Sequence, residues 1–369
     1  MAVKVALIRC ERYDAKEVYR AALRGIELLG GADKHFKKGE TILLKPNLLA
    51  PDPPETATTT HPAVFEAAAR VLMDAGVKIT YGDSPNFSDP LKAFRKSGMY
   101  EVAERLKLPM ADFERKRRVF HEKAKQNKVF DIAEGVASAD GILSLPKLKT
   151  HALTLLTGAV KNQFGCIPGT IKTGFHGKLG TVGEFSQMLV DLTAFLKPRL
   201  YMLDAITGME GNGPRRGSPK HIGALLLSRD PVAVDSTAAR IVGLAPERIM
   251  TNVKGRDSGL GLMDDFEIVG DGIDDFKTKF KLPRLAGNEL TIPPLARALF
   301  LRLLIQRPVV SRAKCTKCHE CREICPTEPK SISIRDDGYP KHNYGTCINC
   351  YCCQETCPAG AISVRIKPL

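Results

Sequence analysis

The sequence predicts an α/β protein with an open, mostly parallel β-sheet, in one or two lobes, followed by a small cysteine-rich α+β domain. Two observations lead to this fold class. Over residues 1–285, short apolar runs alternate with segments of helical periodicity, which is typical of a parallel sheet covered by helices. Nine of the 11 cysteines then lie within the last 55 residues, which sets this part of the chain apart as a separate unit.

The elements of the α/β part are predicted from apolar periodicity and from helix-terminating residues. Residues 3–10 form the first strand, and a helix over 14–29 follows and ends at Gly30. A second helix over 61–75 has Thr60 as its expected N-cap. Further strands are expected at 41–45, 77–81, 141–145, 200–203 and 223–228, and further helices at 181–196 and 231–242.

The chain divides into three parts. Residues 1–285 form the α/β domain, and residues 286–310 form a connecting helix bounded by Pro294 and Pro308. Three arginines interrupt the apolar face of this helix, so it either packs the last part onto the α/β domain or binds a membrane surface or a partner. Residues 311–369 form the cysteine-rich domain.

The composition is that of a globular protein with a basic surface, with 43% hydrophobic residues and a net charge of +14. No apolar run is long enough to span a bilayer, and the start is charged too early for a secretion signal, so we expect a cytoplasmic protein. The densest basic run, residues 115–118, is expected on a solvated helix face or loop. Because no nucleic-acid motif accompanies it, an acidic redox protein is a better expected partner than nucleic acid.

One cysteine motif occurs twice in the C-terminal domain: Cys315, Cys318, Cys321 and Cys325 follow C-x2-C-x2-C-x3-C-P, and Cys347, Cys350, Cys353 and Cys357 repeat it. The domain therefore resembles the two-cluster bacterial ferredoxins, in which three close cysteines hold one [4Fe–4S] cluster and the fourth reaches the other. The resemblance implies two [4Fe–4S] clusters as cofactors. One would be held by Cys315, Cys318, Cys321 and Cys357, and the other by Cys347, Cys350, Cys353 and Cys325.

Zinc and disulfides are the alternatives for these cysteines. Zinc sites favour two separated cysteine pairs and do not require a fourth cysteine before a proline. Disulfide scaffolds suit small secreted domains, which the start of this chain does not indicate. Cys352 lies outside the repeat and is expected to be a small packing residue.

Polar turns follow several expected strands, and such turns gather at one edge of a parallel sheet, where ligands bind. The segment 146–177 adds lysines, histidines and glycines that suit an anionic ligand and acid–base chemistry, although a basic surface loop is the simpler reading. The expected binding residues are Lys45, Asn47, Asp83, Asn162, Asp204, Glu210 and Asn212. The expected catalytic residues are Lys149, His151, Lys161 and His176.

Several of these segments are similar to the family called domain of unknown function 362. The matching stretches are KPN at 45–47, GDSP at 82–85, PKLKTH at 146–151, GAVKNQFGCIPG at 158–169, DAITGMEGNGPRRG at 204–217 and SRDPVAVD at 228–235. Many members of that family carry a ferredoxin module. The resemblance supplies no reaction, because the family is largely uncharacterised.

A looser resemblance is to the nickel-dependent lactate racemases. Those enzymes have a histidine, a lysine that tethers a nickel pincer cofactor, a Pro-Gly pair and a histidine that ligates nickel, which would be His151, Lys161, Pro168-Gly169 and His176. The chain departs from that pattern in residues 157–160, which precede the lysine, and in its ferredoxin-type domain.

Three functions are consistent with the sequence. The first is an iron–sulfur oxidoreductase that passes single electrons through two clusters to an anionic substrate or cofactor in the crevice. The second is a non-catalytic electron-transfer or assembly protein that binds a redox partner. The third is a domain whose clusters only stabilise a fold of roughly 55 residues, too few to bury a large core. No residue identifies the substrate or a further cofactor.

Overall fold

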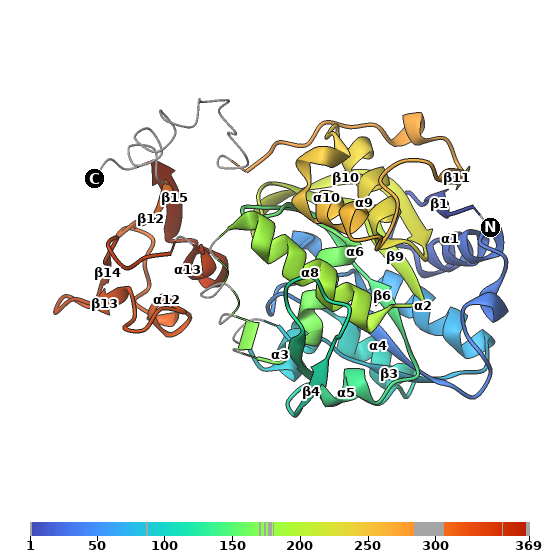
Figure 1. The fold of residues 1–369 in the computed structure, drawn as a ribbon, viewed down its shortest axis with the longest axis horizontal. Coiled ribbons are helices and arrows are strands. Elements are labelled where there is room, and N and C mark those ends of the chain that lie inside the picture. Colours follow the sequence, from blue (N-terminus) through green and yellow to red (C-terminus); the bar gives the residue numbers. More distant parts are fainter. Residues whose placement is uncertain are drawn as a thin grey trace.

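The computed structural model describes residues 2–85, 88–169, 171–172, 175, 179, 181–283, 306–348 and 350–366. Within these residues nine strands form one central sheet (Figure 1). Seven of them lie in the order β11 (Glu267–Gly270), β1 (Lys4–Arg9), β10 (Arg216–Ser228), β9 (Leu200–Asn212), β6 (Gly141–Leu145), β2 (Thr41–Pro46) and β3 (Lys78–Tyr81). Strand β7 (Lys147–His151) pairs with β9, and β8 (Leu155–Thr157) pairs with β7. The prediction of an open, mostly parallel sheet is confirmed, since five of the eight strand pairs are parallel.

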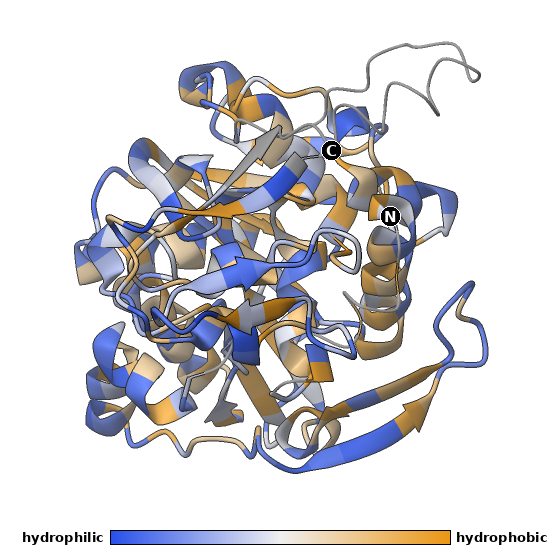
Figure 2. Cartoon of the chain, turned by 90° about the vertical axis from the view of Figure 1, so that its left-hand side faces the viewer, coloured by the Kyte–Doolittle hydropathy of each residue, from blue (hydrophilic) through white to orange (hydrophobic). Residues whose placement is uncertain are grey.

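Helices cover both faces of the sheet (Figure 1). One face packs against α1 (Ala15–Leu28), α2 (Pro62–Asp74) and α4 (Met99–Arg105), and the other against α6 (Ala159–Asn162), α8 (Val182–Leu196) and α9 (Pro231–Ile241). The alternation of side chains along β2 explains this arrangement, because Ile42 and Leu44 join the first core whereas Leu43 joins the second. Hydrophobic residues are accordingly concentrated in the inner strands and helices (Figure 2).

The shorter helices lie at the edges of this sandwich: α3 (Pro90–Lys96) packs on α4, and α10 (Met250–Asp257) packs on α8 and α9. The 3₁₀ turns are η1 (Ala32–Lys34), η2 (Pro54–Thr56), η3 (Gln163–Cys166), η4 (Pro246–Arg248) and η5 (Ile273–Phe276). No helix in the described ranges has the length and apolar character needed to cross a membrane.

The start of α2 differs from the prediction by one residue. His61, and not Thr60, is the N-cap, and its ring accepts a hydrogen bond from the amide of Ala63. The hydroxyl of Thr60 is already engaged, because it accepts from the amide of Asn47 and donates to the carbonyl of Leu145. Thr60 thus ties together the ends of β2 and β6 instead of capping the helix.

The glycine-rich segment 204–219, which the sequence predicts as one of the polar turns, after the expected strand at 200–203, is instead a β-hairpin. Strands β9 and β10 pair from Asn212 and Arg216 down to Tyr201 and Ser228, with one register shift between His221 and Ala224. Low strand propensity hid this element, and the continuous antiparallel hydrogen bonding explains why it forms. The segment 146–177 is also more regular than predicted, since it contains β7, β8 and α6.

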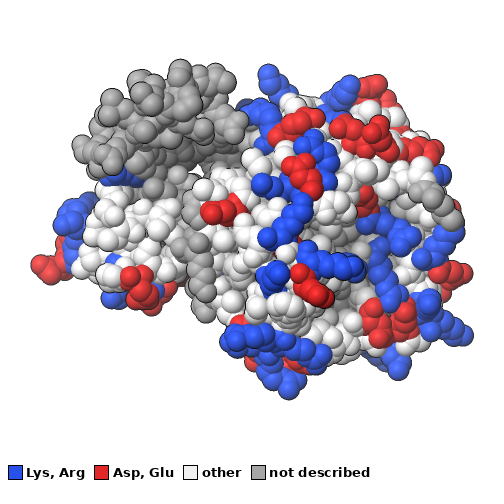
Figure 3. All heavy atoms as spheres, viewed as in Figure 1, with Lys and Arg blue, Asp and Glu red and all other residues white. Residues whose placement is uncertain are grey.

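The basic run at 115–118 lies on a strand, and the prediction of a helix face or loop is wrong. Strand β4 (Lys116–Phe120) pairs with β5 (Val129–Ala133), which is followed by α5 (Glu134–Ala137). Arg118 forms an ion pair of 2.9 Å with Asp131, and Arg117 pairs with Glu134. Figure 3 shows lysines and arginines gathered over this hairpin at the lower edge of the molecule. Acidic partners on the neighbouring strand stabilise the exposed basic strand.

The C-terminal domain has its own small core. Strand β12 (Gln306–Val310) pairs with β15 (Ile362–Ile366), β13 (Ile332–Ile334) pairs with β14 (Pro340–His342), and α12 (Glu320–Glu323) and α13 (Cys352–Thr356) lie between them. The predicted connecting helix falls mostly on residues 284–305, which lie outside the described residues. Residues 306–310, however, are a strand, because β-branched Val309 and Val310 follow a proline that cannot continue a helix.

The strand order contains a reversal of direction beside β2. The chain moves from β2 to β3 through α2 on one face, then returns to β6 on the other side of β2 and continues into α6 and α8 on the opposite face. In open α/β sheets, a crevice for ligands forms outside the carboxyl ends of strands at such a switch point. The fold therefore predicts a site beyond Pro46 and Leu145.

Candidate functional site

A cavity of about 60 Å³ lies at this switch point. Its polar lining comes from the turns after β2 and β3, from the β7–β8 hairpin and from α6. These residues are Asn47, Asp83, Ser84, Lys149, His151, Thr157, Lys161, Asn162 and Lys172. We call this cavity the crevice.

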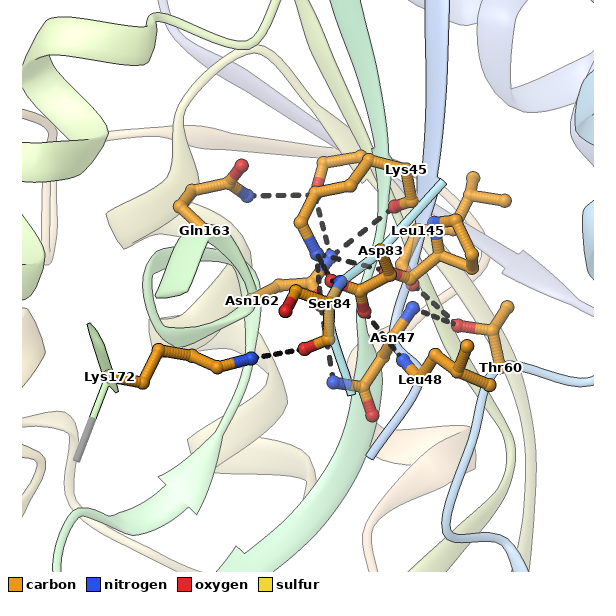
Figure 4. A network of polar contacts seen from close by, with 12 residues as sticks. Lys45, Asn47, Leu48, Thr60, Asp83, Ser84, Leu145, Asn162, Gln163 and Lys172 are labelled. Carbon is orange, nitrogen blue, oxygen red and sulfur yellow. Dashed lines mark hydrogen bonds and ion pairs between the residues drawn. The ribbon is translucent and has the colours of Figure 1, made fainter. Parts of the chain in front are cut away.

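A buried ion pair forms the floor of the crevice (Figure 4). Lys45, at the end of β2, is fully buried, and its Nζ lies 3.0 Å from Oδ1 of Asp83, which follows β3. The second carboxylate oxygen of Asp83 accepts a hydrogen bond of 2.7 Å from the amide of Leu48. Burial of two charges is tolerated only when each is paired and hydrogen-bonded, and both conditions are met here.

Amide side chains extend this network toward the opening (Figure 4). Oδ1 of Asn162, on α6, accepts from Nδ2 of Asn47 at 3.2 Å, while its own Nδ2 donates to Oγ of Ser144 at 2.9 Å. Oδ1 of Asn47 in turn accepts from Nζ of Lys149 at 2.7 Å, and the same ammonium donates to the carbonyl of Thr58. The conformations of Lys149 and Asn162 are therefore fixed by strands and helices before any ligand binds.

Ser84, Gly165 and Lys172 form a second wall. The buried ammonium of Lys172 donates to the carbonyl of Ser84, and Oγ of Ser84 accepts from the amide of Gly169 at 2.8 Å. A Cβ at Gly165 would lie 1.9 Å from Oδ1 of Asp83, so only glycine allows this backbone to approach the ion pair. Burial lowers the pKa of Lys172 to about 7, opposed by the attraction of Asp83 and assisted by Lys45.

His151 and Lys161 both line the crevice. Nδ1 of His151 accepts hydrogen bonds from the amides of Leu153 and Thr154, at 3.0 and 3.2 Å, so the proton of the neutral ring lies on Nε2. Nζ of Lys161 lies 5.7 and 5.9 Å from the ring centroids of Phe164 and Phe185. These aromatic faces favour the cationic form of the lysine.

Asp235 on α9 holds the start of α6. Its carboxylate accepts from the amides of Ala159 and Val160 at 2.6 and 3.1 Å. Burial raises the pKa of Asp235 to about 7, although both backbone hydrogen bonds act in the opposite direction. Asp235 lies outside the crevice and positions the turn that carries Lys161 and Asn162.

Eight cysteines of the C-terminal domain line two small hollows of similar size. Cys325, Cys347, Cys350 and Cys353 line the first, and Cys315, Cys318, Cys321 and Cys357 line the second. Cys352 is buried and lines neither. The eleven cysteines, all within the described residues, form no disulfide in this structure. No group of three or more His, Cys, Asp or Glu side chains in the described part of the chain is arranged to hold a metal ion.

The tip of the β9–β10 hairpin contacts both the crevice and the C-terminal domain. Pro214 lines the crevice. The neighbouring Arg215 donates to the carbonyl of Thr356 at 3.3 Å, and Arg216 donates to the carbonyl of Cys357. Helix α13, which ends at Thr356, is the part of the domain that faces the α/β body in Figure 1.

Residues 42–240 match the family model described as domain of unknown function (DUF362). The chain belongs to this family. A related protein, the thylakoid-associated protein sll1697 of Synechocystis sp., is 34% identical over 252 residues, which cover 68% of this chain and 78% of that protein. The match agrees with the family resemblance deduced from the sequence.

Two solved structures show limited similarity to this DUF362 protein. The lactate racemase apoprotein of Thermoanaerobacterium thermosaccharolyticum has a TM-score of 0.39 at 12% identity, over 61% of this chain and 54% of that one. A structural-genomics protein of Thermotoga maritima has a TM-score of 0.35 at 12% identity, over 55% and 52% of the two chains. The chain spans about half the length of these structures.

Most residues expected in the crevice are brought together in this DUF362 protein. Asn47, Asp83, Lys149, His151, Lys161 and Asn162 line it, and Lys45 lies directly beneath. His176 lies outside the described residues. Ser84, Thr157, Phe164 and Lys172 also line the crevice but were not among the expected binding and catalytic residues, although GDSP contains the first and the segment 146–177 contains the other three.

Three expected binding residues lie elsewhere. Asp204 belongs to a separate buried network, in which its carboxylate pairs with Lys147 at 2.7 Å and accepts from the hydroxyl of Tyr13 at 2.9 Å. Glu210 pairs with Lys220 across the hairpin, and Asn212 ends β9. These residues miss the crevice because they belong to extended strands of the hairpin. A loop at the same position could have folded over the crevice.

Proposed function

We propose that this DUF362 protein is an iron–sulfur oxidoreductase that delivers single electrons to an anionic substrate or cofactor bound in the crevice. The proposal rests on the hairpin tip at 213–216, where neighbouring residues contact the crevice and the cysteine-rich domain. One chain thus joins a thiol-lined electron-transfer domain and a polar cavity through a single β-turn. A fixed connection of this kind replaces a diffusional encounter between donor and acceptor.

The cysteine sites fit two [4Fe–4S] clusters. Each hollow is lined by three cysteines of one repeat and the fourth cysteine of the other, which is the crossed arrangement of two-cluster ferredoxins. In a cubane each cysteine ligates a different iron, so the sulfur atoms need not converge on one point as they do around a single ion. Backbone and hydroxyl groups also reach the sulfurs: the amide of Ala361 donates to Cys357 at 3.2 Å, and Thr327 lies 3.3 Å from Cys325. Such contacts tune the reduction potential of the single-electron carriers that these cysteines would bind.

The crevice suits an anion. Lys149, Lys161 and Lys172 line it, whereas Asp83 is the acidic side chain in its lining and is paired with buried Lys45. Charge-assisted hydrogen bonds from ammonium groups favour carboxylates and phosphates. Lys172, with a pKa of about 7, is suited to proton transfer near neutral pH, which reduction of a bound substrate requires, and the His151 ring lies in the same lining.

Binding of an anion to the crevice is expected to weaken as pH rises through about 7. Lys172 is cationic below its pKa of about 7 and loses that charge above it. Calorimetric titration with sulfate, whose charge is constant between about pH 6 and about pH 8, measures this change, and Lys172→Met is expected to remove it and to weaken binding at the lower pH by about tenfold. Lys128→Met, which removes an exposed lysine outside the crevice, should leave both values unchanged. Equal affinity at both pH values in the unmodified protein would contradict this role.

The proposed function is tested by anaerobic purification, followed by iron analysis and a visible spectrum. About eight iron atoms per chain are expected for two cubanes. The reduced protein is then mixed with a panel of carboxylates and phosphate esters, and one of them should reoxidise the clusters in a reaction that Lys149→Ala abolishes. If the clusters are present but only a second protein reoxidises them, the chain is an electron-transfer or assembly protein and the oxidoreductase proposal fails.

The proposal also places the protein in a reducing compartment such as the cytoplasm. Cluster ligands must stay reduced thiolates, and reducing compartments keep them so. The Synechocystis relative is named as a thylakoid-associated protein, so association with a membrane surface is a second location to be tested for this chain. Fractionation of the native protein by ultracentrifugation separates a free pool from a membrane-associated pool.

A further inference from the structure

The two cysteine repeats differ in which side chain donates a hydrogen bond to the backbone carbonyl of the cysteine before the proline. In the first repeat, Nζ of Lys330 donates to the carbonyl of Cys325 at 3.2 Å and to that of Glu323 at 2.9 Å. In the second repeat, the equivalent carbonyl, that of Cys357, accepts from Arg216 of the α/β domain. A cation thus reaches the same backbone position in both repeats, once from within the domain and once from outside it.

The sequence explains why the second cation must come from outside. Lys330 lies five residues after Cys325, whereas the residue five after Cys357 is Ile362, which is buried in the domain core. Gly360 makes room for the replacement, because a Cβ there would lie 3.0 Å from Cζ of Arg216. The second repeat therefore lacks its own cation and provides a space that the guanidinium fills.

The neighbouring arginine does not serve this purpose. Both guanidinium nitrogens of Arg215 that face Asp52 form hydrogen bonds of 2.8 Å with its carboxylate, so the charge of Arg215 is matched within the α/β domain. Arg215 contributes only its contact with the carbonyl of Thr356 to the domain interface. Arg216 is therefore the side chain that brings positive charge to the ligand set of Cys315, Cys318, Cys321 and Cys357.

We propose that Arg216 is a positioning residue that sets the reduction potential of the cluster at Cys315, Cys318, Cys321 and Cys357, as Lys330 does for the cluster at the other four cysteines. The inference rests on the proposed function in one respect, the presence of both clusters. A nearby positive charge stabilises the more negative, reduced form of a cluster and so raises its potential. The potential of the cluster that includes Cys357 then depends on docking of the domain onto the α/β body. The potential of the cluster that includes Cys325 does not.

The test is a potentiometric titration of the anaerobically purified protein, followed by electron paramagnetic resonance, which distinguishes the two reduced clusters. Arg216→Ala is expected to lower the midpoint potential of one cluster, so that its ratio of reduced to oxidised form at a fixed applied potential falls by up to about tenfold, equivalent to 59 mV for one electron. Lys330→Ala is the matched variant and should lower the potential of the other cluster only. Arg216→Lys should restore most of the lost potential.

The possible results separate the role of Arg216 from the presence of the clusters. If Arg216→Ala leaves both potentials unchanged, or if the two variants shift the same cluster, the inference is wrong while the proposed function stands. If the purified protein contains no iron–sulfur signal, the proposed function fails first. A variant that merely unfolded the domain would lose both signals, and iron analysis of each variant identifies that case.

Discussion

Replacement of Asp83 by alanine is expected to lower the free energy of unfolding by about 3–5 kcal/mol. The reason is the fully buried ammonium of Lys45, whose partner at 3.0 Å would be removed. The amide of Leu48 would lose its acceptor as well. Urea unfolding followed by circular dichroism measures the change. Because these groups form the floor of the crevice, anion binding should be lost together with stability.

Glu267→Ala is the control for this experiment. Glu267 pairs with Lys4 at 3.4 Å on the same sheet, but both side chains are about half exposed, at 53% and 43%. An exposed pair contributes less than about 1 kcal/mol, so this variant should unfold almost like the parent protein. The double variant Lys45→Met, Asp83→Ala should recover part of the loss, since it removes the unpaired charge. A cost for Asp83→Ala as small as that of the control would show that water or another group satisfies Lys45.

Loss of a single cysteine from either repeat is expected to remove one cluster and leave the other. Cys357→Ala should reduce the iron content from about eight to about four atoms per chain. Paired substitutions test which cysteines act together. Because Cys315 and Cys357 line the same hollow, the variant lacking both should keep about four iron atoms, whereas the variant lacking Cys347 and Cys357 should keep almost none.

Cys352 provides the matched control. It is 4% exposed and lies beside Cys353 in the chain, but it lines neither hollow. Cys352→Ala should therefore retain all the iron, at a small cost from lost packing. If the variant lacking Cys315 and Cys357 lost all its iron while that lacking Cys347 and Cys357 kept half, the assignment of the fourth ligands would be reversed.

The sheet and several crevice residues were predictable because they depend on local patterns. Strand β6 occupies the predicted residues 141–145, and α8 and α9 differ from prediction by one residue at one end. Lys45, Asn47 and Asp83 were found from a general property of parallel sheets, that polar turns after the strands share one edge. The family assignment followed from short motifs at these same turns and is confirmed.

What the sequence did not reveal depends on contacts between distant segments. The hairpin at 204–219 contains glycines that normally weaken a strand, and only pairing of β9 with both β10 and β7 makes it regular. Asp204 was expected in the crevice, but Lys147 and Tyr13 hold it in another network. Lys172 was expected only as one of the clustered lysines of segment 146–177, without a role of its own, because its local sequence does not show that its ammonium is buried against Ser84.

The β9–β10 hairpin connects the core of the sheet with the cysteine-rich domain. Each strand has 13 residues, which extend over roughly 40 Å at about 3.3 Å per residue. The half of β10 nearest Ser228 is buried in the sheet, whereas the half nearest Arg216 is mostly exposed. One end of the hairpin is thus anchored in the core, and its tip contacts the cysteine-rich domain. Because Pro214 lines the crevice and Arg216, two residues further on, contacts the cysteine-rich domain, any displacement of that domain would reach the crevice wall through this one turn.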